Sequence, residues 1–166
     1  MFSRKLDVVA DFFYRIAYWA SATMLVIIFL TTLLQVFCRY VLEHSLSWSE
    51  ETSLIFFPWV VFLGASMVLK ERGHVAIMFV VNAFPVRLRN IVKVFIDVMV
   101  AFFACYLVVF GWKLSVFVGA EQLTTFWNVP YFYLYLSVCA GGAFLLIQAM
   151  LLLARDTANF FGWDEK

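Results

Sequence analysis

Four long stretches of this sequence contain no Asp, Glu, Lys or Arg, and the charged residues gather between them. These stretches are residues 16–37, 52–69, 98–112 and 122–154. A helix rises about 1.5 Å per residue and the hydrocarbon layer of a bilayer is about 30 Å thick, so about 20 apolar residues are needed to cross it. Because lipid offers no hydrogen-bond partner to the backbone, such segments must be helical. The pattern predicts an all-α integral membrane protein with four spans, at about residues 16–38, 52–69, 91–112 (with 118 as an alternative end) and 130–153.

Composition also indicates a membrane location. Hydrophobic residues make up 65% of the 166 residues, whereas apolar residues make up about 45–50% of a typical soluble domain. The length predicts a single membrane domain, residues 1–166. The net charge is only +1, and no basic patch indicates a nucleic-acid partner. Membrane lipid is therefore the expected surroundings of this chain.

The distribution of Lys and Arg predicts the orientation of the spans. Ten of these twelve residues fall before the first span, between the second and third spans or after the fourth, and only Arg39 and Lys113 fall on the other side. Lys and Arg accumulate in cytoplasmic loops. We therefore expect a multi-pass protein of the bacterial inner membrane, with both termini in the cytoplasm and the loops at 40–51 and 114–128 in the periplasm.

The segment from His74 to Pro85 connects the second and third spans. Residues 75–81 are all apolar, but this stretch is too short to cross the bilayer. We predict a short helix here, which lies at the inner interface or packs under the bundle and is ended by Pro85.

Asp97 is the only acidic residue inside a predicted span. It lies four residues after Lys93, so the two side chains share a helix face and are expected to pair near the inner interface. Because an acidic group within the membrane is costly, a proton or ion relay is the alternative interpretation.

The loop before the second span has the densest set of polar residues. Residues 47–50 have the S-x-x-E form of a capping box, and Glu50 and Glu51 lie at the positive end of the helix dipole. Arg39 ends the first span across this loop. We predict a charge cluster of Arg39 with Glu50 or Glu51, with Trp48 beside it. The alternative is a set of solvated charges without fixed contacts.

Small residues occur together at two positions within the spans. Gly64 is followed by Ala65 and Ser66, and Gly141 lies in the stretch 137–143, which is rich in Ser, Ala and Gly. Small residues allow two helices to approach closely in a membrane. Gly64 and Gly141 are therefore candidate contact points, either within the bundle or toward a partner.

The order and spacing of several short motifs resemble a known family, the small membrane subunits of tripartite ATP-independent periplasmic (TRAP) transporters. The similarity extends over the whole chain in size, span number and orientation. The motifs that carry it are Arg39-Tyr40, residues 47–51, residues 62–65, Gly73-His74-Val75, Pro85, Gly119, Gln122 and Val129-Pro130. Two departures are Met78, where family members often have an acid four residues after the His, and residues 139–141, where they often have Pro-x-Gly.

This resemblance implies a three-part importer driven by a sodium gradient. A periplasmic binding protein would capture an organic carboxylate, such as a four-carbon dicarboxylate, a sialic acid or another sugar acid, and a large multi-span subunit would transport it. The small subunit would act as a brace that does not itself transport. The sequence suits that role, because it has no pair of broken helices of the kind that forms midplane substrate sites.

Three other classes of function compete with this one. A membrane enzyme is disfavoured because the sequence has no H-E-x-x-H, no G-x-S-x-G and no clustered acid pair, so we assign no catalytic, cofactor or metal site. A haem-binding anchor subunit of a respiratory complex would need histidines that share a haem, but His44 and His74 are expected on opposite sides of the membrane. A self-contained small transporter would need Asp97 as its central polar group.

Overall fold

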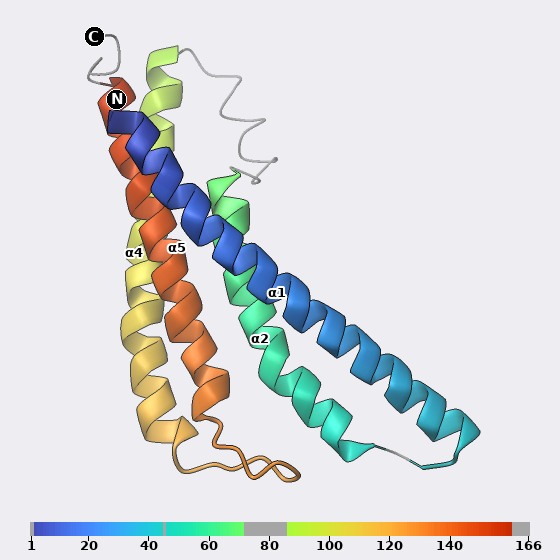
Figure 1. The fold of residues 1–166 in the computed structure, drawn as a ribbon. Helices are drawn as coiled ribbons and strands as arrows, with labels where there is room; N and C mark the ends of the chain where they lie inside the picture. The colour runs from blue at the N-terminus through green and yellow to red at the C-terminus, as the bar shows by residue number, and fades with distance from the viewer. Residues whose placement is uncertain (1, 45, 72–85, 161–166) are drawn as a thin grey trace.

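The computed structural model describes residues 2–44, 46–71 and 86–160, and in these ranges the regular structure is helical apart from one isolated β-bridge, Leu123–Pro130. The elements are α1 (Phe2–Val41), α2 (Ser47–Lys70), α4 (Val86–Leu114), the π-helical turn η1 (Ser115–Gly119) and α5 (Phe132–Phe160) (Figure 1). Four segments are long and apolar enough to cross a membrane: Asp7–Val41, Ser47–Lys70, Ile91–Gly119 and Phe132–Arg155. The predicted all-α fold with four spans is confirmed. The predicted interfacial helix at 74–85 lies outside the described residues.

The helices form two antiparallel pairs that meet along α5. α1 and α2 are joined by a short connection, and α4 and α5 by residues 120–131 (Figure 1). α5 contacts α1, α2 and α4. The two pairs lie close together where the chain termini are and diverge toward the opposite end (Figure 1). We call these the termini end and the loop end, the latter defined by residues 42–51 and 119–131.

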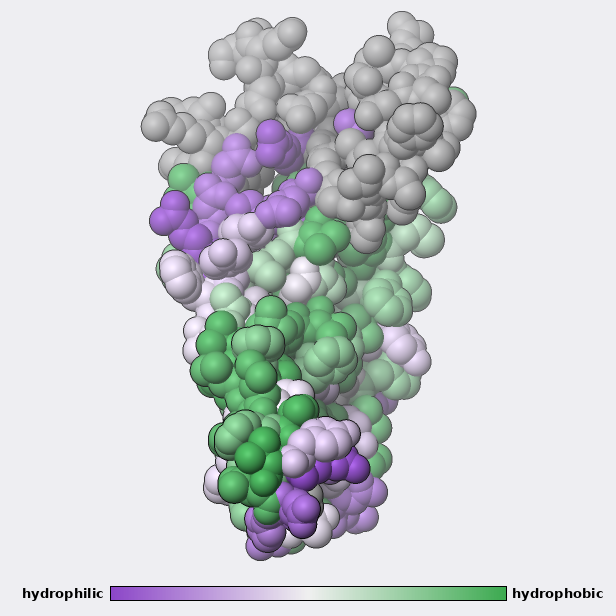
Figure 2. Space-filling view, turned by 90° about the vertical axis from the view of Figure 1, so that its right-hand side faces the viewer, coloured by the Kyte–Doolittle hydropathy of each residue, from purple (hydrophilic) through white to green (hydrophobic). Residues whose placement is uncertain are grey.

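The small core lies around α5. Its buried apolar residues come from three helices and are Leu69, Ala104, Leu145, Ala149 and Leu152. Most large apolar side chains of α1 and α4 are instead exposed. Figure 2 shows, on one face, a broad apolar band with polar residues above and below it. Such a surface suits a chain whose middle lies in lipid, where apolar side chains need no cover from water.

Glycines allow the closest approaches between helices. A Cβ added to Gly111 of α4 would lie 2.8 Å from the backbone nitrogen of Cys139 in α5. A Cβ on Gly141 would collide with Phe62 of α2, whose carbonyl carbon would be 3.1 Å away. α5 can therefore lie against α4 and α2 with almost no space between the backbones, as small residues permit in membrane bundles.

The two predicted glycine contact points behave differently. Gly141 is a close-approach point within the bundle. Gly64 is not one, because no heavy atom of the described residues lies within 4 Å of its Cβ position. A side chain added at Gly64 would therefore enter open space, although the residue itself is half-buried.

Candidate functional site at the loop end

The start of α2 is where three segments of the chain are joined. α2 begins at Ser47 with Leu46 as its N-cap residue, and no side chain caps it. The predicted capping box is therefore wrong, because Ser47 is already helical and cannot act as the N-cap. The side chains of the first turn make contacts with other segments instead.

Ser49 and Glu50 connect α2 to α1. The Ser49 hydroxyl, which is fully buried, donates a hydrogen bond of 2.8 Å to the backbone carbonyl of Thr31. The side-chain amide of Gln35, one turn further along α1, donates to Glu50 Oε1 at 2.7 Å. A hydroxyl and an amide within apolar helices need partners, and the neighbouring helix supplies both.

Glu51 connects α2 to the loop between α4 and α5. The backbone N–H of Phe126 donates to Glu51 Oε1 at 2.6 Å, and that of Trp127 donates to Oε2 at 3.0 Å. Hydrogen bonds to a carboxylate are stronger than those between neutral groups. Each carboxylate oxygen of Glu51 therefore takes one backbone N–H of the loop tip.

The loop that Glu51 binds has its own regular hydrogen bonds. The N–H of Thr124 donates to the carbonyl of Val129 at 2.9 Å, and the N–H of Tyr131 donates to that of Gln122 at the same distance. Asn128 has a φ of 51°, which is the left-handed conformation that Asn tolerates in tight turns. The loop is thus a short hairpin-like turn with its tip turned toward α2.

One further contact crosses between the helix pairs near this end. The indole N–H of Trp59 in α2 donates to the backbone carbonyl of Tyr133 in α5 at 3.1 Å. Together, residues 49–51, Gln35, Trp59 and the 124–131 turn form a set of contacts that we call the loop-end junction. It holds α1, α2 and the α4–α5 connection at fixed positions relative to one another.

The predicted cluster of Arg39 with the two acids is not present. Arg39 is exposed, and among the described residues it forms no ion pair with Glu50 or Glu51. Gln35 lies one turn before Arg39, and its side-chain amide donates a hydrogen bond to Glu50. The carboxylate of Glu51 accepts hydrogen bonds from the loop instead. Trp48 is half-buried in the same turn of α2.

The remaining predicted site residues are not brought into this junction. Asp97 is buried in α4, with 6% of its surface exposed, and Lys93 is half-buried one turn before it. Their pairing stays a prediction. His74 lies outside the described residues.

A second set of polar contacts, at the termini end, was missed by the sequence reasoning. Lys70 of α2 pairs with Asp11 of α1, and Arg155 of α5 pairs with Asp7 of α1 at 3.1 Å. Gln148, buried in α5, donates to the carbonyl of Ala10 at 3.0 Å. The available signal was the presence of Gln148 within an apolar span, since a buried amide there requires a partner.

At both ends, the polar side chains form hydrogen bonds and ion pairs that connect the helices. Four apolar helices held together at each end by polar contacts define a polytopic α-helical membrane protein. The family model described as tripartite ATP-independent periplasmic transporters, DctQ component, matches residues 28–159. The chain belongs to this family and is a small permease subunit of a TRAP transporter.

Curated relatives agree with this membership. A putative TRAP transporter small permease protein of Haemophilus influenzae is 30% identical over 141 residues, which cover 84% of this chain and 83% of that protein. The sialic acid TRAP transporter permease protein SiaT of another H. influenzae strain is 32% identical over 87 residues, 52% of this chain but only 14% of SiaT. The C4-dicarboxylate TRAP transporter small permease protein DctQ of Vibrio cholerae is 27% identical over 84 residues, 51% of this chain and 36% of that protein.

Proposed function

We propose that this subunit is a non-transporting brace for the large transport subunit of a sodium-driven, binding-protein-dependent importer of organic carboxylates. Its partners would be that large membrane subunit and a periplasmic substrate-binding protein. The names of SiaT and of the V. cholerae relative support sialic acid and four-carbon dicarboxylates as candidate substrate classes, beside other sugar acids. The Lys and Arg distribution supports a bacterial inner-membrane location with cytoplasmic termini.

The observation that carries this proposal is that the described spans have no break near their middle, and that the ion pairs and most side-chain hydrogen bonds between helices lie near the two ends. Substrate and ion sites of secondary transporters are typically built from discontinuous helices near the midplane. α2 continues through Pro58, and the π-helical turn η1 follows the end of α4, beside the loop end. Two buried serines, Ser66 and Ser115, donate to carbonyls of their own helices. The described helices therefore resemble a frame more than a transport pathway.

The exposed surface supports a large membrane partner. Phe102 of α4 and Phe117 of η1 each have 72% of their surface exposed, and no heavy atom of the described residues lies within 4 Å of the Cβ position of Gly64 in α2. In lipid, helices associate through close packing and polar contacts, and small residues are enriched where they meet. We propose Gly64 as a point where a helix of the large subunit approaches. The alignment with SiaT also supports a large membrane partner. It covers only 14% of SiaT, so a segment similar to this chain occurs there within a much longer permease.

Reconstitution with each component omitted in turn tests the proposal. Vesicles that contain both membrane subunits and receive the binding protein should take up substrate when a sodium gradient is present. Vesicles with this chain alone, or without it, should not. Sodium-free vesicles serve as the control for coupling. Uptake by this chain alone, or full uptake in its absence, would contradict the brace.

A further inference from the structure

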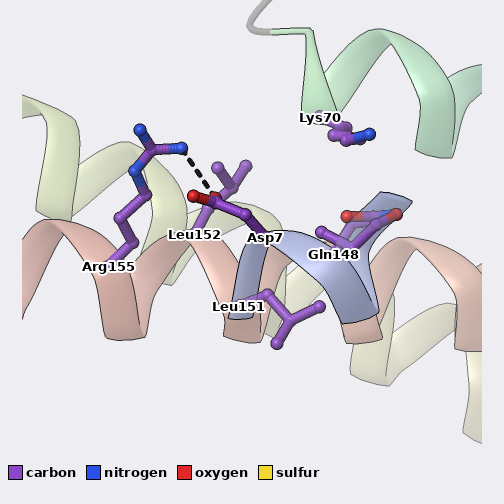
Figure 3. Close-up of a pocket in the computed structure, with 7 residues that line it drawn as sticks. Asp7, Lys70, Gln148, Leu151, Leu152 and Arg155 are labelled. Atoms are coloured by element: carbon purple, nitrogen blue, oxygen red, sulfur yellow. Dashed lines mark hydrogen bonds and ion pairs between the residues drawn. The ribbon is translucent and has the colours of Figure 1, made fainter. Parts of the chain in front are cut away.

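A small polar pocket lies between α1, α2 and α5 at the termini end (Figure 3). Its volume is about 60 Å³, and its lining residues are Asp7, Ala10, Lys70, Gln148, Leu151, Leu152 and Arg155. A site for one water molecule requires only about 10–15 Å³, provided that two to four polar groups surround it. The pocket meets the requirement for space.

Gln148 supplies a buried polar atom that needs a partner. Its residue is 1% exposed, and its amide nitrogen donates to the Ala10 carbonyl. Its carbonyl oxygen Oε1 has no hydrogen-bond partner among the described residues. A buried acceptor left in this state costs free energy, and native proteins satisfy nearly all such groups with protein or ordered water.

The charged groups around the pocket can complete a hydrogen-bond network. Asp7 bonds to Arg155 through Oδ1, and Lys70 bonds to Asp11 (Figure 3 draws the first of these). An ammonium group has three donors and a carboxylate can accept about four hydrogen bonds. Lys70 and Asp7 therefore keep hydrogen-bonding capacity beyond these pairs. A water molecule in the pocket would find both a donor and several acceptors.

We propose that this pocket binds ordered water, which donates a hydrogen bond to Gln148 Oε1 and links it to Asp7 and Lys70. The water would join α1, α2 and α5 through one network. A metal cation is disfavoured as the occupant, because Lys70 and Arg155 place two positive charges on the lining and both neighbouring acids are already paired. The inference needs no transport activity, so it stands or fails independently of the proposed function.

Water-edited NMR of the full chain in lipid bilayers tests the proposal directly. Glutamine labelled with ¹⁵N in its side chain reports three amides, those of Gln35, Gln122 and Gln148. Gln122 is exposed in the loop and provides the reference for contact with water. The Gln148 signal should receive magnetisation from water at a rate comparable with that of Gln122. No transfer to Gln148 within the time that saturates Gln122 would overturn the proposal.

Assignment of these signals does not depend on a single variant. Gln148→Met should remove the Gln148 signal, and Gln35→Met and Gln122→Met should identify the other two. If Gln148→Met fails to fold, the other two variants still assign the remaining signal to Gln148 by difference.

Thermal unfolding of the same variants provides a second test. Gln148→Met loses the hydrogen bond to the Ala10 carbonyl in either case, so the comparison is with Gln35→Met, which also removes one side-chain amide hydrogen bond. If water satisfies Gln148 Oε1, a further hydrogen bond is lost, and Gln148→Met should lower Tm by more than Gln35→Met. If the pocket is dry, removal of the unsatisfied acceptor offsets the loss, and Gln148→Met should lower Tm by less. Replacing sodium by choline at constant ionic strength should leave the wild-type Tm unchanged. A sodium-dependent rise in Tm that Gln148→Met abolishes would identify a cation in place of water.

Discussion

Three consecutive side chains at the start of α2 bind three different backbone or side-chain groups. Ser49 binds the Thr31 carbonyl, Glu50 binds the Gln35 amide, and Glu51 binds the tip of the 120–131 loop. Successive residues of a helix point about 100° apart, so neighbours reach different surroundings. Each contact can therefore be removed separately, and its effect should appear in a different part of the molecule.

Loss of the Glu51 carboxylate should release the loop and leave the α1–α2 contact in place. In Glu51→Ala, the amides of Phe126 and Trp127 lose their acceptors, so we expect them to exchange with deuterium faster than in the wild type. Hydrogen–deuterium exchange of the 120–131 segment in lipid nanodiscs measures this. Glu50→Ala is the matched control and should leave these amides as protected as before. Equal exchange in wild type and Glu51→Ala would show that the loop does not depend on this residue.

A double-mutant cycle distinguishes the partner of Glu50. Gln35→Ala and Glu50→Ala remove the same hydrogen bond, so together they should lower Tm by less than the sum of the separate effects. Arg39→Ala combined with Glu50→Ala should be additive, because the described structure has no ion pair between these residues. Thermal unfolding of the single and double variants measures the coupling for each of the two pairs. Coupling between Arg39 and Glu50 would restore the original charge-cluster hypothesis.

Among the helices, α5 has the central position, and glycines determine how closely its neighbours approach. Gly111 of α4 meets the backbone of Cys139, and Gly141 of α5 meets Phe62 of α2. Contacts of this kind involve backbone atoms, which cannot move aside as a flexible side chain can. The α4–α5 and α2–α5 interfaces should therefore tolerate little added volume.

Two alanine substitutions should separate internal packing from an open helix surface. Gly111→Ala places a Cβ against the α5 backbone, and such overpacking should lower the unfolding free energy by about 1–3 kcal/mol. Gly64→Ala meets nothing among the described residues and should raise it by about 0.5–1 kcal/mol, because Ala is the better helix former. Unfolding of the isolated chain in detergent compares the two. A similar loss in both variants would mean that Gly64 is also packed within the bundle.

The helices could be predicted from the sequence because bilayer thickness sets the length of an apolar span, whatever packs against it. The partners of polar side chains could not. Glu51 binds backbone groups 75 and 76 residues away, and such a pairing depends on how two helices are rotated and offset along their axes. The local S-x-x-E motif predicted a cap that the helix start at Ser47 does not permit. Small residues within a span predict possible contact points, and Gly141 is one within the bundle, whereas Gly64 is not.

The molecule as a whole has a polar junction at each end and apolar surface between them. At the termini end, the exposed ion pairs Lys70–Asp11 and Arg155–Asp7 contribute little individually. Each pair nevertheless connects α1 to another helix, Lys70–Asp11 to α2 and Arg155–Asp7 to α5. α1 is therefore joined to other helices at both the loop end and the termini end.

At the scale of the whole molecule, we predict that both termini lie in the cytoplasm and that the 114–128 loop lies in the periplasm. A single cysteine introduced by Thr125→Cys, in a background without Cys38, Cys105 and Cys139, should react with an impermeant thiol reagent added to spheroplasts. One introduced by Lys5→Cys should react only after the membrane is permeabilised. The expectation follows from the positive charges near the termini end. The opposite labelling pattern would reverse the assignment of cytoplasmic and periplasmic sides.

The length of α1 has a consequence for the lipid around the protein. At about 1.5 Å per residue, its 40 residues extend about 60 Å, twice the thickness of the hydrocarbon layer. Such a helix must tilt strongly, project beyond the bilayer or thicken it locally, and each adjustment costs free energy that depends on membrane thickness. Because α1 and α2 diverge from α4 and α5 (Figure 1), the protein also occupies a wide area of membrane for its mass. In the proposed role as a brace, this wide footprint would give the large subunit a neighbour that resists rotation within the bilayer.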